Sequence, residues 1–558
     1  MNSNFFIIIL FYFLSIYSVI GYGKIFCRLF LNKENNLNFG YIGLFGIFFL
    51  ILYSYLSHFL FSHNYTHNLF ILVFGLILFF IFFDKSYKEL IFTTLVFLVL
   101  SISLLIFKTH DDFPYYHFGY TNYLTENSLL IGVGQFNHGF RTPSSIFYLN
   151  SLFSFSFIKF YFFHLASLMI MGFVNIIFLN YMIDKIKNNK FNHIGYFVLL
   201  SLIFINIFFS RIAEHGTDRS AQILILLFIF EILILFSMKL INKINISKIL
   251  MSLGIIISLK SFYILYLIVL LPVIYFLIKE IKMKKTLFLF IKNKTFYLFG
   301  LLFVIILTTN LFNTGCLIYP VNLTCFPGLD WSIASSEVVK MNNWYELWSK
   351  AGATPNFRIN SPDEYISRLN WVGNWIDGYF FNKVSDFLLG IIFTVILLLG
   401  IFYSKIKKEF IINKYISYVL LFLFILFIEW FYNHPALRYG GYSLIVAIIF
   451  IPISILLSTF STKTKFFKKK IIVLVAITFF IFFSRNVSRI SNEVEQYNFK
   501  PLSDFSFRVA EGHYRIINVF KCLIRKHEDN DLDNKACKPP NGILVGEFLN
   551  TYKFYFLN

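Results

Sequence analysis

Apolar runs of about 20 residues, separated by short polar segments, recur along nearly the whole chain. A helix of that length crosses the hydrocarbon core of a bilayer and satisfies its own backbone hydrogen bonds there. None of the runs alternates as a membrane β-strand does. We therefore predict spanning helices at 4–22, 41–60, 69–83, 89–107, 160–183, 195–210, 221–238, 249–259 with 262–278, 296–313, 386–404, 415–432, 442–460 and 471–484.

Lys260 and Ser261 interrupt the apolar run at 249–278. We predict two helices here, each shorter than a full span, that meet near one membrane face, because broken helices are tolerated where they line a cavity. A single long tilted span is the alternative. The first run, at 4–22, follows no basic segment and ends at no small-residue cleavage site, so we expect a retained span and not a removed signal peptide.

Composition agrees with this pattern. Of the 558 residues, 58% are hydrophobic and only 14% are charged, whereas about 25% of residues in soluble domains are charged. We predict an all-α polytopic membrane protein with about 12–14 spans, external interfacial helices and a small external α/β tail. Its segments are a four-span set (1–107), an external loop with interfacial helices (108–159), a central membrane bundle (160–313), a second external loop (314–385), a carboxy-terminal membrane bundle (386–484) and the tail (485–558).

The formal net charge of +20 is a signal of membrane topology. Every second connection is short and basic, and the basic excess of these connections equals the whole net charge. Loops rich in Lys and Arg stay on the cytoplasmic side, so no basic surface is left for nucleic acid. The basic connections fall within 24–33, 85–88, 185–190, 239–248, 279–294, 405–414 and 463–470.

The other connections are therefore predicted to be external, provided that 249–278 returns to its starting side and so places Lys260 at the external face. The candidate chemistry-bearing residues gather on that face, although the topology was derived only from lysines and arginines in the opposite connections. The external connections are 61–68, 108–159, 211–220, 314–385, 433–441 and 485–558.

The first candidate site is HDDFPYYH, where the fourth span ends. Asp111 and Asp112 are adjacent carboxylates that repel each other, which suits a general base or a ligand of a divalent metal ion. His117 and several tyrosines follow and can wall a cleft. The alternative is a helix cap in a solvated loop, with Pro114 opening the next helix.

Further along the same loop, GVGQFNHGFRTP places His138 and Arg141 before a helix that we expect to be capped near Thr142, with Pro143 at its start. An arginine beside a helix start is suited to bind phosphate or pyrophosphate. The alternative is a structural arginine paired with Asp111 or Glu126.

Two further external segments add charged side chains. The connection RIAEHGTDRS is either a solvated hairpin or a second part of the site, and it carries Arg211, Glu214, His215, Asp218 and Arg219. In EWFYNHPALRYGGY, Pro435 breaks a helix and two glycines let the backbone approach a ligand. Aromatic belts explain the aromatic residues that precede this break, but not the remaining candidates, His434, Arg438 and Tyr439.

Four of the five cysteines form two close pairs in external segments, and Cys27 lies alone on the predicted cytoplasmic side. An oxidising exterior favours disulfides between such neighbours, and unpaired thiols are the alternative. We predict the pairs Cys316–Cys325 and Cys522–Cys537.

Glu231, inside a span, is either a packing partner for a Tyr, His or Lys or a proton relay. The tryptophans of 314–385 can stack on sugars, although anchoring a loop core or a membrane interface is their more common role. The sequence contains no metal-ligand cluster of fixed spacing, no dinucleotide fingerprint and no GxSxG elbow.

Four features of the sequence resemble the GT-C superfamily of multi-pass glycosyltransferases. They are the external acidic pair before amphipathic helices, the second acidic patch at Glu214 and Asp218, the half-spanning helices around Lys260 and the external carboxy-terminal region. The resemblance is architectural and covers 90–460. It implies a GT-C-like helical bundle that transfers a sugar from a polyprenyl-phosphate or polyprenyl-pyrophosphate donor. In that superfamily the acidic loop usually follows the first span, whereas four predicted spans precede it here.

On this resemblance we expect inverting glycosyl transfer at the external face of a bacterial inner membrane. Asp111 or Asp112 would deprotonate the acceptor or hold Mg²⁺ or Mn²⁺, and cations would bind the leaving phosphate, where charge develops. These cations would come from Arg141, Arg211, Lys260 or Arg438. The expected partners are the lipid bilayer, a polyprenyl-linked sugar donor and a glycan, lipid or protein acceptor, with no nucleic acid.

Two alternatives stay open. Polymerases and ligases of surface polysaccharides, of the O-antigen type, rely on external arginines and a histidine, which Arg141, Arg211, His434 and Arg438 would supply. A transporter or flippase of lipid-linked glycans needs charges at both faces and through the membrane depth. The ionisable candidates gather at one face, with Glu231 the main exception, and this distribution argues against transport.

Overall fold

The computed structural model describes residues 3–31, 37–83, 87–110, 112–158, 160–188, 190–212, 216–353, 359–405, 413–460, 466–502, 543–549 and 552–557. Within them, eleven helices are long and apolar enough to cross a membrane, and two shorter apolar helices accompany them. The described part of the chain contains one two-stranded sheet. The predicted class, an all-α polytopic membrane protein, is confirmed.

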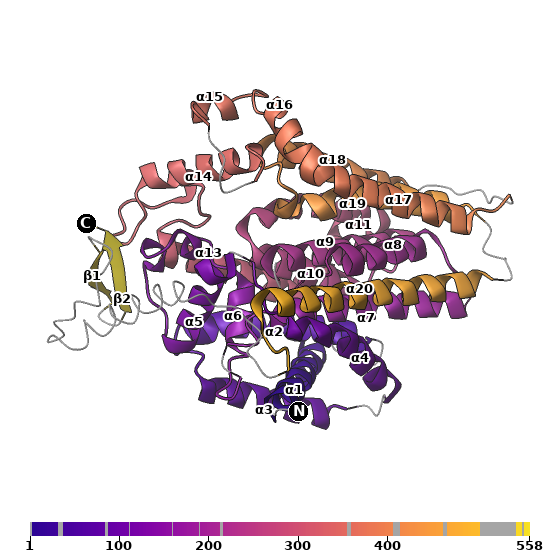
Figure 1. Ribbon diagram of the computed structural model, residues 1–558, viewed down its shortest axis with the longest axis horizontal. Coiled ribbons are helices and arrows are strands. Elements are labelled where there is room, and N and C mark those ends of the chain that lie inside the picture. Colours follow the sequence, from indigo (N-terminus) through magenta and orange to yellow (C-terminus); the bar gives the residue numbers. More distant parts are fainter. Residues whose placement is uncertain are drawn as a thin grey trace.

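Most of the long helices run along the long axis of the molecule (Figure 1). The helices of the bundle, whatever their direction, are α1 (Ser3–Phe26), α2 (Phe39–His58), α3 (Tyr65–Ile81), α4 (Tyr87–Leu100), α7 (Leu165–Lys187), α8 (His193–Phe208), α9 (Gly216–Met238), α10 (Lys243–Leu259), α11 (Leu270–Ile281), α12 (Met283–Ile291), α13 (Lys294–Thr314), α17 (Ser385–Phe402), α18 (Lys414–Asn433), α19 (Tyr442–Ser458) and α20 (Phe467–Tyr497).

Short elements join these helices. Those of the first large loop are η3 (Phe113–His117), α5 (Phe118–Glu126), η4 (Val133–Gln135), η5 (His138–Arg141) and α6 (Ser145–Ser151). Those of the second are η7 (Asn322–Thr324), α14 (Ser335–Lys350), α15 (Pro362–Ile366), α16 (Val372–Trp375) and η8 (Ile376–Val384). The others are η1 (Cys27–Leu31), η2 (Ser101–Leu105), η6 (Ser261–Val269), η9 (Leu437–Gly441), β1 (Ile543–Phe548) and β2 (Tyr552–Leu557).

Described residues of the predicted basic connections contact one another at one end of the bundle, which we call the basic end. Phe467, at the start of α20, packs on Phe402 at the end of α17, with ring centroids 5.6 Å apart. Lys294, at the start of α13, donates to the carbonyl of Leu29 after α1, at 2.8 Å. The alternation read from the lysines and arginines therefore agrees with the packing of the helices.

The opposite end, which we call the polar end, carries α5, α6, α14 and the β-hairpin (Figure 1). Helix α20 runs past its predicted end at 484 as far as Tyr497, and the Glu493 carboxylate there accepts from the backbone N–H of Phe107 at 2.8 Å. The hairpin also packs on the first loop, because the Tyr555 N–H donates to the carbonyl of Ile131 at 3.0 Å. A left-handed glycine, Gly132, with φ of 76°, lets the two backbones approach at this point.

The chain breaks at Lys260, as predicted, and returns toward the basic end. Lys260 has an extended backbone, with φ of −161°, which ends α10. The two segments differ from the prediction in length. Helix α10 has 17 residues and Ser261–Ile281 has 21, so each is close to the full span that a bilayer requires.

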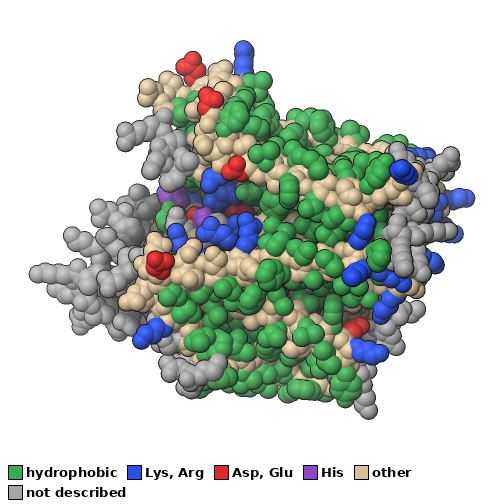
Figure 2. Space-filling model, turned by 45° about the vertical axis from the view of Figure 1, so that its right-hand side comes forward, with side chains coloured by type: hydrophobic (Ala, Val, Ile, Leu, Met, Phe, Trp, Pro, Cys, Tyr) green, Lys and Arg blue, Asp and Glu red, His purple; other side chains and the backbone are tan. Residues whose placement is uncertain are grey.

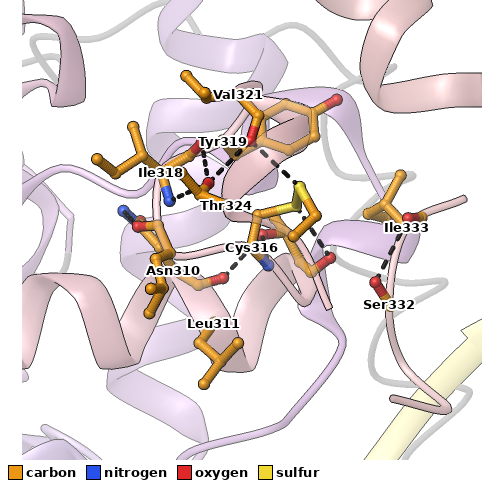
Figure 3. The surroundings of a disulfide bond; sticks show 12 residues. Asn310, Leu311, Cys316, Ile318, Tyr319, Val321, Thr324, Ser332 and Ile333 are labelled. Atoms are coloured by element: carbon orange, nitrogen blue, oxygen red, sulfur yellow. Dashed lines mark hydrogen bonds between the residues drawn. A yellow bond between two sulfur atoms is a disulfide. The ribbon is translucent and has the colours of Figure 1, made fainter. Parts of the chain in front are cut away.

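The disulfide between Cys316 and Cys325 is present (Figure 3). It closes a loop in which the Thr324 hydroxyl donates to the carbonyl of Ile318 at 3.0 Å. Tyr319 lies in this loop and reaches Arg141, so the disulfide supports part of the polar end. Cys27 is buried and forms no disulfide within the described residues. The predicted pair Cys522–Cys537 lies outside the described residues.

Candidate functional site

Four charged side chains from separate segments meet at the polar end, and we call them the charged quartet: Asp112, Asp218, Lys260 and Arg438. The Lys260 ammonium donates to the Asp218 carboxylate. The Arg438 guanidinium bridges the two acids, with Nε 3.2 Å from Asp218 and a terminal nitrogen 2.5 Å from Asp112. The sequence predicted all four residues as candidates, and the tertiary structure joins them.

Local backbone breaks place the two cations of the quartet. Lys260 is the residue with an extended backbone between α10 and η6, so it belongs to neither helix. Arg438 lies in η9, before Gly440, whose φ of 91° turns the chain into α19. Gln222 of α9 holds this turn, because its amide donates to the Arg438 carbonyl at 3.2 Å and accepts from the Ser443 N–H at 3.1 Å.

The two acids of the quartet have different surroundings. The side chain of Asp218 is only 5% exposed and is held by both cations, whereas that of Asp112 is 25% exposed. Burial by itself would raise the pKa of Asp112, but Arg438, His117 and His110 together lower it from its ordinary value. Asp112 is thus an ionised carboxylate that a substrate can reach.

His117 lies beside these acids between the rings of Tyr116 and Phe147, whose centroids are 4.4 and 5.0 Å from its own. Burial lowers the pKa of His117 to about 4 against the opposing effect of Asp112 and Asp218, so the imidazole is neutral near pH 7. Its Nε2 atom is buried and has no hydrogen-bond partner among the described residues. A neutral ring with one unused nitrogen can bind a hydroxyl group.

Aromatic rings wall the quartet. Trp348 of α14 packs on Tyr439 with centroids 5.6 Å apart, and the Arg438 guanidinium lies 5.5 Å from the Trp348 ring. Figure 2 shows a hollow on this face in which Lys or Arg, His and acidic side chains come together. An aromatic ring attracts a cation without neutralising its charge, so the cation can still bind an anion.

Arg141 has structural partners that the sequence analysis did not name. Its guanidinium is 3.1 Å from Glu337 of α14 and 3.2 Å from the Tyr319 hydroxyl. Asp111, one of the two partners considered from the sequence, lies outside the described residues. The α6 helix also begins later than expected, because Ser144 and not Thr142 is its cap, and Pro143 precedes that cap. A two-residue shift of this kind lies within the accuracy of a sequence pattern.

The remaining predicted residues divide into three groups. His138 lies 3.9 Å from Glu337, beside Arg141, and His434 lies near Tyr439, with ring centroids 6.2 Å apart. Arg211 is exposed after α8, and Arg219 lies over the Phe209 ring at 5.7 Å. Asp111, Glu214 and His215 lie outside the described residues.

The described residues do not fit a divalent metal ion. Asp112 and Asp218 are matched by the two cations of the quartet, so these two carboxylates have no excess negative charge to attract Mg²⁺ or Mn²⁺. Asp111, the other predicted ligand, lies outside the described residues. Among the described residues, no group of three or more His, Cys, Asp or Glu side chains is arranged to hold a metal. We therefore derive no chemical step through a metal.

Several residues of this site were missed by the sequence analysis. Glu337 and Tyr345 lie in the polar helix α14, and Gln222 lies in the apolar helix α9. None of the three belongs to a sequence motif. A buried Gln in a spanning helix is the one signal that could have singled out Gln222, since polar side chains in a membrane need partners. Burial raises the pKa of Tyr345, and the charges of Arg141 and Asp112 both act on it.

The fold and the site together define a multi-pass membrane protein with a paired charge cluster at one end of its bundle. Residues 5–445 match a family described as a domain of unknown function (DUF8201), and the chain belongs to that family. No curated protein and no solved structure matches the chain. The description of the family assigns no activity, so the function is argued from the geometry of the site.

Proposed function

We propose that the protein is a membrane glycosyltransferase that transfers a sugar from a polyprenyl-phosphate-linked donor to an acceptor at the external face of a bacterial inner membrane. One observation carries this proposal: the charged quartet assembles two acids and two cations from four segments at the polar end of a membrane bundle. A site in this position can receive a lipid-linked anion from the bilayer and an acceptor from the aqueous phase.

The two cations are suited to the leaving phosphate. Arg438 offers a planar fork of donors that matches phosphate oxygens, and Lys260 adds a compact positive charge. Their aromatic neighbours exclude water and therefore strengthen the attraction to an anion. Arg141 and His138, which both lie beside Glu337, are a second place where a pyrophosphate could bind.

The two acids have separate roles in this proposal. Asp218 is buried between both cations, and it positions them. Asp112 is more exposed and, of the two cations of the quartet, contacts only Arg438, which it shares with Asp218. When the phosphate takes over Arg438, the pKa of Asp112 rises because its nearest positive charge is then shared, and the carboxylate becomes a better base.

In the reaction, the bond between the sugar and the phosphate oxygen breaks as the acceptor hydroxyl oxygen attacks the anomeric carbon from the opposite side. The hydroxyl proton passes to Asp112, and His117 Nε2 orients the hydroxyl. The bonding electrons leave with the phosphate, whose growing negative charge Arg438 and Lys260 stabilise. The transferred sugar therefore inverts its configuration.

The test uses cells that express the full chain, in which surface glycans and accumulated lipid-linked intermediates are compared. We expect Asp112→Asn, Asp218→Asn, Lys260→Gln and Arg438→Gln each to lose the glycan product and to accumulate the donor. Matched controls are the exposed residues Asp363 and Lys383, as Asp363→Asn and Lys383→Gln. Unchanged glycan profiles in all four quartet variants, with the protein still in the membrane, would contradict the proposal.

The same experiment separates the main alternative. A surface-polysaccharide polymerase or ligase depends on arginines more than on carboxylates, and the buried Arg141 favours this reading. In that case Arg141→Gln and Arg438→Gln would abolish long glycan chains, whereas Asp112→Asn would keep them. Asp111→Asn belongs in the same series, because the sequence alone makes Asp111 a second candidate base.

A further inference from the structure

The six tryptophans of the chain fall into two groups. Trp331, Trp371, Trp375 and Trp430 are buried, and the indole N–H of each donates to a backbone carbonyl at 3.0 or 3.1 Å. These four anchor the core and the loops. Trp344 is 43% exposed and Trp348 is half-buried. Neither of their indole N–H groups has a hydrogen-bond partner among the described residues.

Trp344 and Trp348 extend the wall of the charged quartet outward. Their rings are nearly parallel, with an interplanar angle of 23° and centroids 6.4 Å apart. Trp348 contacts Tyr439, and the Lys260 ammonium lies 5.1 Å from the Tyr439 ring. A continuous aromatic surface therefore leads from the exposed side of α14 to the two cations.

This surface suits a sugar better than a lipid. A pyranose ring presents one face of C–H groups that packs on an aromatic ring, while its hydroxyls bind nearby donors such as a free indole N–H. A helix that anchors in a membrane presents a broad apolar face. The exposed side of α14 is instead mixed, since Ser336, Lys340 and Asn342 accompany Val339 and Trp344 there.

We infer that Trp344, Trp348 and Tyr439 form a glycan-binding subsite, which holds an acceptor of more than one sugar against the charged quartet. This inference rests on the proposed glycosyltransferase function and gives it a substrate class: the acceptor is a saccharide and not a protein side chain or a single lipid head group. The subsite sets the direction in which the acceptor enters, along α14 toward Asp112.

The full chain in detergent is tested for binding to an array of immobilised bacterial oligosaccharides. We expect Trp344→Ala and Trp348→Ala each to weaken binding about tenfold, because each removes one stacking ring. Trp348→Phe keeps a ring and should retain most of the binding. The matched control is Phe381→Ala, an exposed aromatic of η8 that lies outside this surface in the described contacts.

Binding that both alanine variants leave unchanged overturns the subsite, and so does a chain that binds no glycan on the array. Binding to phosphatidylglycerol vesicles that is lost in the same variants identifies a membrane anchor and also overturns it. Glycan transfer that persists at full rate in the tryptophan variants refutes the subsite alone. Tryptophan-dependent glycan binding, with surface glycans unchanged in the Asp112 and Asp218 variants, refutes the glycosyltransferase alone.

Discussion

Helix α9 carries two buried carboxylates in very different settings. Asp218, near its start, is held by Lys260 and Arg438 and is linked through Arg438 to the reachable Asp112. Glu231, about 20 Å further along, accepts from the Tyr41 hydroxyl and has no ion pair within the described residues. The Lys248 ammonium lies over the Tyr41 ring, at 3.9 Å from its centroid.

The contrast shows that burial of an acid does not by itself make a site. Glu231 has the neutral partner on a neighbouring helix that the sequence analysis named as one of its two alternatives, which fits a packing role. Asp218 belongs to a network of opposite charges that reaches a hollow lined by aromatic rings. Buried ion pairs contribute little net stability, and a charged network beside a hollow is a candidate for binding or catalysis.

The largest difference is expected between the two acids of α9 when each is neutralised in turn. Asp218→Asn should lower glycan transfer by about 1,000-fold, because it releases both cations that bind the phosphate. Glu231→Gln should lower it less than about twofold, because Gln still accepts from Tyr41. Transfer rates in membranes with equal amounts of each variant measure both. Equal losses in the two variants would remove the distinction between the two settings.

A smaller effect is expected from pH, through His117. The folded pKa of about 4 lies below the ordinary value of 6.5, so between these values the unfolded chain binds a proton that the folded chain does not. The contribution of His117 to the free energy of unfolding is therefore greatest above pH 6.5 and should fall, by at most about 3 kcal/mol, as the pH drops to 4. Thermal unfolding in detergent at several pH values measures this.

His117→Gln is the control for that measurement, since Gln does not titrate. The decline should become smaller but persist in part, because burial also lowers the pKa of His164. Asp112 does not interfere, because its pKa is lowered from 3.8 and its own contribution is lost only at more acidic pH. A decline of the same size in wild type and His117→Gln would show that other groups cause it.

A comparable effect on stability, without a matching effect on chemistry, is expected at the disulfide. Cys316→Ser with Cys325→Ser opens a loop with a sequence separation of 9 residues, which should cost about 2–3 kcal/mol of unfolding free energy. The bond supports Tyr319 and hence Arg141, but the charged quartet has its own supports. The folded double variant should therefore transfer glycan at a rate within about threefold of that of the wild type. A loss as large as that of Asp218→Asn would make the Arg141 group part of the catalytic centre.

The smallest effect is expected from Tyr41→Phe, which removes the hydroxyl that donates to Glu231. Leaving one buried acceptor without its donor should cost about 1–3 kcal/mol of stability and leave transfer unchanged. Thermal unfolding and the glycan profile measure the two properties. Reduced transfer in this variant would indicate that Glu231 takes part in function, as the relay alternative proposed.

The sequence by itself determined the membrane class, the approximate spans and the alternation of the connections. It could do so because these properties depend on local composition: about 20 apolar residues make a span, and lysines mark one side. It also singled out Asp112, Asp218, Lys260 and Arg438, since charged residues next to spans are costly unless they are paired or used. The sequence likewise predicted the pairing of Cys316 with Cys325, which lie close together along the chain.

Only the tertiary structure decided which of these residues share one site. Arg438 meets Asp112 across a separation of 326 residues, and Arg141 meets Glu337 across 196. No local pattern encodes such contacts, because they depend on how the helices pack and where each one ends. The break at Lys260 and the left-handed Gly440 are local features, but the site that they serve exists only once α9, α10 and α19 lie together.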